Sequence, residues 1–134
     1  MYADISYGLE KEAGCLEKLE SIFGKLEHTK GFYSLWDYEN TNVIIEIKSR
    51  RVSKKHYPTT IISQKKIDAM LKEKREAYAI FNFTDGLWGY PIDEESLECC
   101  CMADGGRSDR GSFEFNSYCY IPTDKLVKIE EKNN

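Results

Sequence analysis

The decapeptide NVIIEIKSRR, residues 42–51, constrains the fold of this chain more than any other stretch. The run Val43-Ile44-Ile45 is apolar on both faces of an extended chain, as in a central strand that is covered on both sides. Side chains alternate along a strand, so Glu46 and Lys48 share one face. Excluding water from two opposite charges costs several kcal/mol per ion. The stretch therefore predicts a buried strand that ends in a charged pair with a function, or else an edge strand with an exposed ion pair.

The rest of the chain alternates between helical and extended patterns. Apolar residues at helical spacing predict helices over 9–26 and 62–75, and extended patterns predict strands near 32–38, 43–49 and 77–83 in one sheet. Asp85-Gly86 predicts a tight hairpin, and another strand pair is expected around a mobile loop at 105–111. The 134 residues therefore predict one α/β domain spanning 1–134, with a central mixed sheet flanked by helices and a C-terminal hairpin extension.

Composition excludes several classes of protein. No apolar run approaches the roughly 18 residues that span a bilayer, and residues 1–14 lack the pattern of a secretion signal. Five cysteines, three of them adjacent at 99–101, fit a reducing cytoplasmic compartment better than a disulfide framework. We interpret Cys99-Cys100-Cys101 as small strand residues, because neighbours on a strand point to opposite faces and cannot converge on one metal.

The charge distribution indicates an anionic partner. The net charge is −4, yet no acidic residue occurs between Glu46 and Asp68, and that interval holds the basic residues Lys48, Arg50, Arg51, Lys54, Lys55, Lys65 and Lys66. Such a concentration of positive charge is typical either of a solvated loop or of a surface that follows a phosphate backbone.

A second carboxylate gives the charged pair a chemical reason. Asp37 lies on the preceding strand of the same predicted hairpin, nine residues before Glu46. Two carboxylates and a backbone carbonyl are hard oxygen ligands of the kind that Mg²⁺ prefers. A lysine two residues further on can then hold the attacking water and offset charge that develops on a phosphate.

These residues resemble the PD-(D/E)XK nuclease superfamily: Asp37, then Glu46-Ile47-Lys48 on a strand that ends in KSR, after a helix with a glutamate. Trp36-Asp37 replaces the Pro-Asp of the family name and leaves the acid intact. The resemblance implies a restriction-endonuclease-like αβββαβ core and cleavage of nucleic acid with Mg²⁺ or Mn²⁺.

The resemblance also implies roles for individual residues. Asp37, Glu46 and the Ile47 carbonyl would hold the metal, and Lys48 would assist the water nucleophile. Members often have a glutamate on the first helix, for which Glu12 fits best and Glu20 is the second choice. They also often have a Lys or Gln on the following helix, for which Lys66 is favoured over Gln64.

The resemblance implies a nuclease of the junction-resolvase type or the viral and phage type, which recognises a DNA structure or end and acts as a homo-oligomer. The alternative is a non-catalytic module that uses the same fold to bind nucleic acid or a protein. The residues expected to contact DNA are Arg50, Arg51, Lys54, Lys55, Gln64, Arg107 and Arg110.

Overall fold

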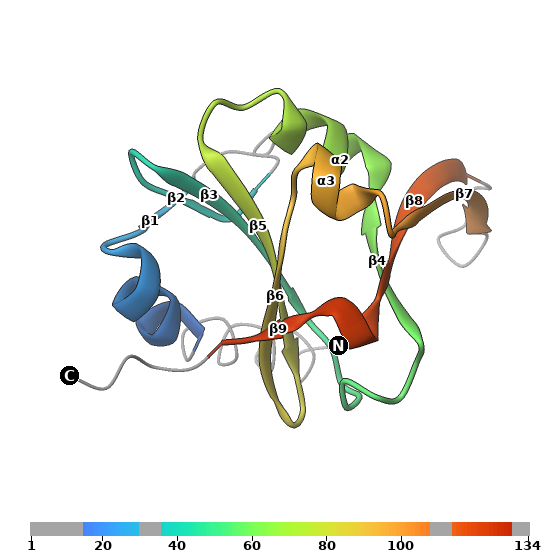
Figure 1. The fold of residues 1–134 in the computed structure, drawn as a ribbon, viewed down its shortest axis with the longest axis horizontal. Helices are drawn as coiled ribbons and strands as arrows, with labels where there is room; N and C mark the ends of the chain where they lie inside the picture. The colour runs from blue at the N-terminus through green and yellow to red at the C-terminus, as the bar shows by residue number, and fades with distance from the viewer. Residues whose placement is uncertain (1–14, 30–35, 108–113, 130–134) are drawn as a thin grey trace.

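The computed structural model describes residues 15–29, 36–107 and 114–129, with the backbone alone for 104–107 and 114–116. Figure 1 shows a large sheet through the middle of the molecule and a smaller sheet beside it. Helices cover the large sheet. The predicted α/β fold with a mixed central sheet is confirmed, and it is consistent with a restriction-endonuclease-like fold. No helix in the described ranges is long and apolar enough to cross a membrane.

The large sheet holds six strands within the described residues, in the order β1-β2-β3-β5-β6-β9. Strands β3 and β5 are parallel, and the other neighbours are antiparallel. The bounds are β1 (Glu27–His28), β2 (Tyr38–Glu39), β3 (Val43–Ser49), β5 (Glu76–Phe83), β6 (Gly86–Pro91) and β9 (Val127–Lys128). The predicted strands near 43–49 and 77–83 therefore lie in one sheet, with β3 near its centre. The strand predicted near 32–38 is wrong in extent: within the described residues it is only Tyr38–Glu39, because residues 36 and 37 form a bend before it.

The predicted C-terminal hairpin does not stand alone. Strands β7 (Cys101–Arg107) and β8 (Glu114–Pro122) pair as expected, and β8 also pairs with β4 (Thr59–Ser63). The result is a second sheet of three strands, in the order β4-β8-β7. A short 3-10 helix, η1 (Thr123–Lys125), then leads the chain back to β9 at the edge of the large sheet.

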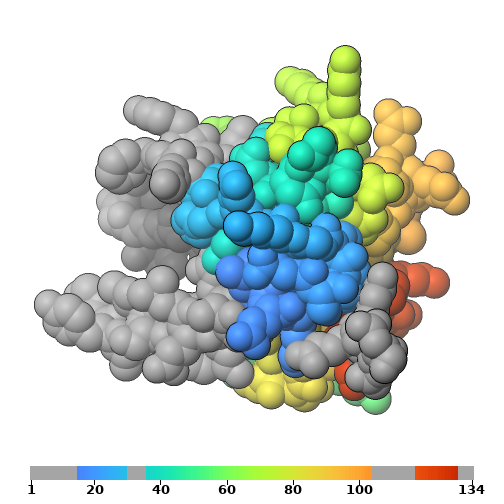
Figure 2. All heavy atoms as spheres, turned by 90° about the vertical axis from the view of Figure 1, so that its left-hand side faces the viewer, coloured from blue at the N-terminus to red at the C-terminus, as the bar shows by residue number. Residues whose placement is uncertain are grey.

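Strand β3 is buried on both faces, as its sequence predicts. Val43, Ile45 and Ile47 pack in one apolar cluster with Leu19 of the helix over residues 15–23. Figure 2 shows that side of the molecule, where residues 15–29 lie in front, next to the hairpin of β2 and β3. Ile44 points the other way, into a cluster with helix α2 (Gln64–Leu71) and the second sheet. The Glu46 face of β3 is therefore the face that α2 covers.

The second helix begins later than predicted. Residues 62 and 63, which the helical pattern includes, belong to β4, and α2 begins at Gln64. The reason is local and tertiary: Thr59-Thr60-Ile61-Ile62 is β-branched throughout and pairs with β8, while Ser63 caps the helix through its Oγ. The helix ends at Leu71, before the predicted residue 75.

The predicted tight turn at Asp85-Gly86 is displaced by one residue. The hairpin at 76–91 has Thr84-Asp85 as its loop, and Gly86 is the first residue of β6 with a φ of 149°. A Cβ there would lie 3.0 Å from the Trp88 ring, so any other residue would have a strained φ and would also require a small shift of that ring.

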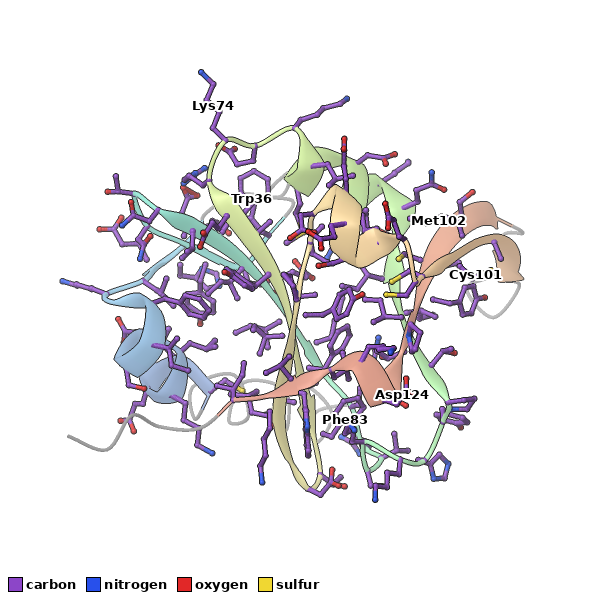
Figure 3. All side chains as sticks on the ribbon, viewed as in Figure 1. Trp36, Lys74, Phe83, Cys101, Met102 and Asp124 are labelled. Atoms are coloured by element: carbon purple, nitrogen blue, oxygen red, sulfur yellow. The ribbon has the colours of Figure 1, made fainter. Side chains whose placement is uncertain are left out.

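The three adjacent cysteines are not all strand residues. Only Cys101 lies in a strand, beside Met102 in Figure 3, because the short helix α3 (Glu94–Leu97) and its turn take up the residues before it. Cys99 and Cys100 both approach the Tyr90 hydroxyl, at 3.3 and 3.7 Å. None of the five cysteines, all of which lie in the described ranges, forms a disulfide bond.

The double burial of β3 predicts a stability effect. We expect Ile44→Val to lower the free energy of unfolding by about 0.5–1.5 kcal/mol, because Ile44 is fully buried and loses one methylene of packing. Val127→Ala removes more carbon from an exposed side chain and should change it by no more than about 0.5 kcal/mol. Urea denaturation measures both. Equal losses in the two variants would contradict the burial of Ile44.

Candidate active site

The turn between β2 and β3 sets the register that brings the two predicted carboxylates together. Asn40 Oδ1 accepts hydrogen bonds from the backbone N–H groups of Asn42 and Val43, at 2.8 and 2.9 Å. This side-chain turn is typical of asparagine at a hairpin. The strands then pair Glu39 with Ile44 and Tyr38 with Ile45, so that Asp37 comes opposite Glu46.

Asp37 extends the pairing of β2 with its side chain. Its backbone N–H donates to the Ile45 carbonyl at 2.9 Å, and its Oδ2 accepts from the Ile47 N–H at 2.8 Å. The carboxylate is therefore held beside the end of β3. Backbone groups of alternate residues point to the same side of a strand, and the carbonyls of Val43 and Ile45 both bond on the β2 side. The Ile47 carbonyl thus faces the side on which Asp37 lies.

Glu46 is the most deeply buried charged residue of the candidate site, with 2 % of its surface exposed. Its Oε1 accepts hydrogen bonds from Lys66 Nζ at 2.5 Å and forms an ion pair with Lys48 Nζ at 3.2 Å. Its Oε2 is buried without a hydrogen-bond partner in the part of the chain that the structure describes. A buried carboxylate oxygen without a donor is costly, so this atom is suited to a cation.

The two lysines on Glu46 have pKa values shifted in opposite directions. Burial lowers the pKa of Lys48, and the positive charge of Lys66 adds to that effect, while Glu46 opposes it. Burial also lowers the pKa of Lys66, but its hydrogen bond to Glu46 and the negative charges of Glu46 and Asp37 outweigh burial and raise it overall. Both side chains are partly exposed, so they can reach a ligand.

A basic groove adjoins the charged cluster formed by Glu46, Lys48 and Lys66. It has a volume of about 760 Å³ and lies between the end of β3 with the segment after it and the wall formed by β4 and α2. Among the described residues, its basic lining residues are Lys48, Arg50, Lys54, Lys65 and Lys66, and no acidic residue lines it. Phe83, labelled at the end of β5 in Figure 3, also lines it.

The residues predicted to contact DNA are only partly gathered in this groove. Arg50 and Lys54 line it, whereas Arg51 and Lys55 are exposed outside its lining and Gln64 is the first residue of α2. Arg107 is the last residue of β7 and not a loop residue, and only its backbone is described. Glu12 and Arg110 lie outside the described residues.

Glu20, the second choice for the glutamate on the first helix, has a different contact. Glu20 Oε2 accepts a hydrogen bond from the Leu26 backbone N–H at 2.9 Å, so it stabilises the end of its own helical segment.

One wall of the groove was not predicted from the sequence. Thr59, Thr60 and Ile61 of β4 line it, together with Tyr57 before that strand and Tyr118 of β8. The β-branched run at 59–62 was the available signal for β4. Its pairing with β8, more than fifty residues away, has no local signal.

Potential ligands of a divalent metal are the two carboxylates and one carbonyl. Mg²⁺ usually takes one or two protein carboxylates and leaves its other positions to water and phosphate. No group of three or more His, Cys, Asp or Glu side chains within the described ranges is arranged to hold a metal. The set Asp37, Glu46 and Ile47 carbonyl has only two such side chains, and the free Glu46 Oε2 fits a cation.

An acid directly before one strand, a Glu-x-Lys on the neighbouring strand and a mixed sheet with helices on both faces define the PD-(D/E)XK class, which the sequence predicted. A family model described as "Phage putative PDDEXK endonuclease" matches residues 16–129, and the chain belongs to this family. Neither the curated proteins nor the solved structures include a match to the chain.

Proposed function

We propose that this protein is a metal-dependent nuclease that hydrolyses phosphodiester bonds in DNA and recognises a structure or an end. The observation that carries the proposal is the buried Glu46, which lies between two lysines and keeps one oxygen without a partner in the described chain. Family membership supports the same chemistry.

The proposed metal ligands are Asp37, Glu46 and the Ile47 carbonyl. Bound there, Mg²⁺ or Mn²⁺ supplies Lewis-acid stabilisation of the charge on the phosphate and lowers the pKa of water. The Ile47 N–H orients the Asp37 carboxylate through its hydrogen bond to Oδ2. Lys66 fixes Glu46 from the side of α2.

The proposed role of Lys48 is to hold the attacking water and to offset charge on the scissile phosphate. Its ammonium is already positioned by Glu46 Oε1, so little side-chain freedom is lost when substrate binds. Glu12, which the resemblance assigns to the same centre, keeps its proposed role of orienting a metal-bound water or a second ion.

The basic residues of the groove supply the proposed contacts to phosphates. Such contacts bind DNA without reading its sequence and weaken as salt rises. The described chain offers a groove with no acidic lining residue, next to Lys48 and Lys66. This arrangement favours a strand whose backbone leads to the charged cluster.

Cleavage of labelled DNA tests the proposal. Single-stranded, nicked, duplex and four-way DNA should be incubated with Mg²⁺, with Mn²⁺, and with chelator. We expect metal-dependent cleavage with a preference for DNA that has an end or a junction. Absence of cleavage from every substrate with both metals would leave the protein a binding module.

Metal binding should also be visible without activity. We expect millimolar Mn²⁺ to raise the thermal midpoint, because an ion that binds only the folded state stabilises it, by about 2.7 kcal/mol at one hundred times its Kd. Differential scanning fluorimetry with and without Mn²⁺ measures the shift. Ca²⁺ and Mg²⁺ serve as comparison ions, and an unchanged midpoint with all three would count against the metal site.

A further inference from the structure

Tyr57 is an exposed aromatic side chain on a fixed backbone. It has 58 % of its surface exposed and lines the basic groove. Its carbonyl accepts a hydrogen bond from Thr123 Oγ1 at 3.0 Å, and the next residue, Pro58, accepts from the Thr123 N–H at 2.9 Å. The ring lies edge-to-face with His56, with ring centroids 4.5 Å apart. The backbone is therefore held in place while the ring stays accessible.

The groove around Tyr57 is built to hold an anionic chain. Arg50 Nη2 donates to the Ile61 carbonyl at 3.0 Å, which ties the end of β3 to β4. Lys54, in the turn after β3, is held against the β5–β6 loop, since its backbone N–H donates to Asp85 Oδ1 at 3.0 Å. A rigid, positively charged groove with an exposed aromatic ring is the combination that binds single-stranded nucleic acid.

An aromatic ring can select between unpaired and paired DNA. The bases of a duplex are already stacked and paired, and taking one out costs a few kcal/mol. An unpaired base has a free face and can stack on a tyrosine without that cost. Tyr57 and the two lysines on Glu46 line the same groove, so a strand with a base on Tyr57 can place its phosphates near Lys48 and Lys66.

We propose that Tyr57 is the stacking platform for an unpaired DNA base and that the groove binds a single strand. This inference deepens the proposed nuclease function and rests on it, since it names the form of DNA that enters the candidate site. Tyr118 lines the same groove from β8 and offers a second aromatic surface.

The test compares Tyr57→Ala with Tyr57→Phe in the full-length protein. Fluorescence anisotropy in chelator, where cleavage cannot interfere, measures the affinity for labelled oligothymidylate and for the corresponding duplex. We expect Tyr57→Ala to weaken single-strand binding by about 5- to 150-fold, the effect of losing one base stack. Tyr57→Phe keeps the ring and should bind like the unchanged protein, and duplex affinity should not change in either variant.

Lys55→Ala is the matched control, because Lys55 is exposed two residues before Tyr57 but does not line the groove. It should weaken single-strand and duplex binding alike, and its affinity should depend less steeply on salt concentration than that of the unchanged protein. An equal loss of both affinities in Tyr57→Ala, or no loss of either, would overturn the inference. The affinity for labelled oligouridylate shows whether the protein discriminates between RNA and DNA. Tighter binding of RNA than of DNA would overturn the assignment to DNA.

Failure of this inference is distinguishable from failure of the proposed function. Metal-dependent cleavage with unchanged single-strand affinity in Tyr57→Ala would leave the nuclease and remove the platform. Loss of single-strand affinity in Tyr57→Ala without cleavage of any substrate would leave the stacking platform and remove the nuclease.

Discussion

Lys48→Ala is expected to lower the cleavage rate by about 10²–10⁴-fold, the range that general-base or electrostatic assistance usually supplies. The reason is that the Lys48 ammonium would contact the water and the phosphate more strongly in the transition state than in the bound substrate. Affinity should therefore fall much less than rate. Single-turnover cleavage and anisotropy on the same substrate measure both quantities.

Lys55→Ala provides the control for Lys48→Ala as well. Both substitutions remove one positive charge, but only Lys48 lies 3.2 Å from the Glu46 carboxylate. A lysine that only contacts a phosphate should weaken binding modestly and reduce the salt dependence by about one unit. If the two variants behave alike in rate and affinity, Lys48 is a binding residue and the catalytic assignment is wrong.

Asp37→Asn should have the second large effect, a loss of cleavage of about 10³-fold or more, because metal ions supply several kcal/mol of transition-state stabilisation. Asparagine has the same shape and keeps an oxygen that can accept the Ile47 N–H, so the hairpin should survive. What disappears is the negative charge that would hold the proposed ion. The variant should also lose the Mn²⁺-dependent shift in thermal midpoint.

Asp85→Asn makes the same chemical change at a carboxylate that accepts from the Lys54 backbone N–H on the β5–β6 loop. It should retain cleavage and the Mn²⁺ shift. Full activity in Asp37→Asn, with an intact thermal transition, would show that Asp37 does not hold a catalytic metal.

The parts of the site that were predictable are close together in sequence. Asp37 and Glu46 belong to one hairpin, and the Asn40 turn fixes their register through hydrogen bonds to the next residues. The Glu-Ile-Lys spacing on a strand then places Lys48 on the same face as Glu46. Periodicity and turn chemistry are local properties, so this arrangement could be anticipated before the fold was known.

The contact of Lys66 with Glu46 depends on more than local pattern. Lys66 was preferred over Gln64 from the apolar stripe of the second helix, but that helix begins two residues later than predicted. Ser63 caps it and β4 precedes it, and Ile67 and Met70 are buried in the cluster that also holds Ile44 of β3, on the side where Lys66 reaches Glu46. The direction of a side chain on a helix is set by how the helix packs.

The sequence by itself determined the central strand, its hairpin partner and the placement of Asp37, Glu46 and Lys48 at the end of β3, because their interactions join residues within about ten positions. Only the tertiary structure decided that β4 pairs with β8 and that this second sheet, with Tyr57 and Tyr118, forms a wall of the basic groove. The pairing of Ile61 with Tyr120 closes a long loop, and the free energy of such a contact comes from burial that no local pattern records.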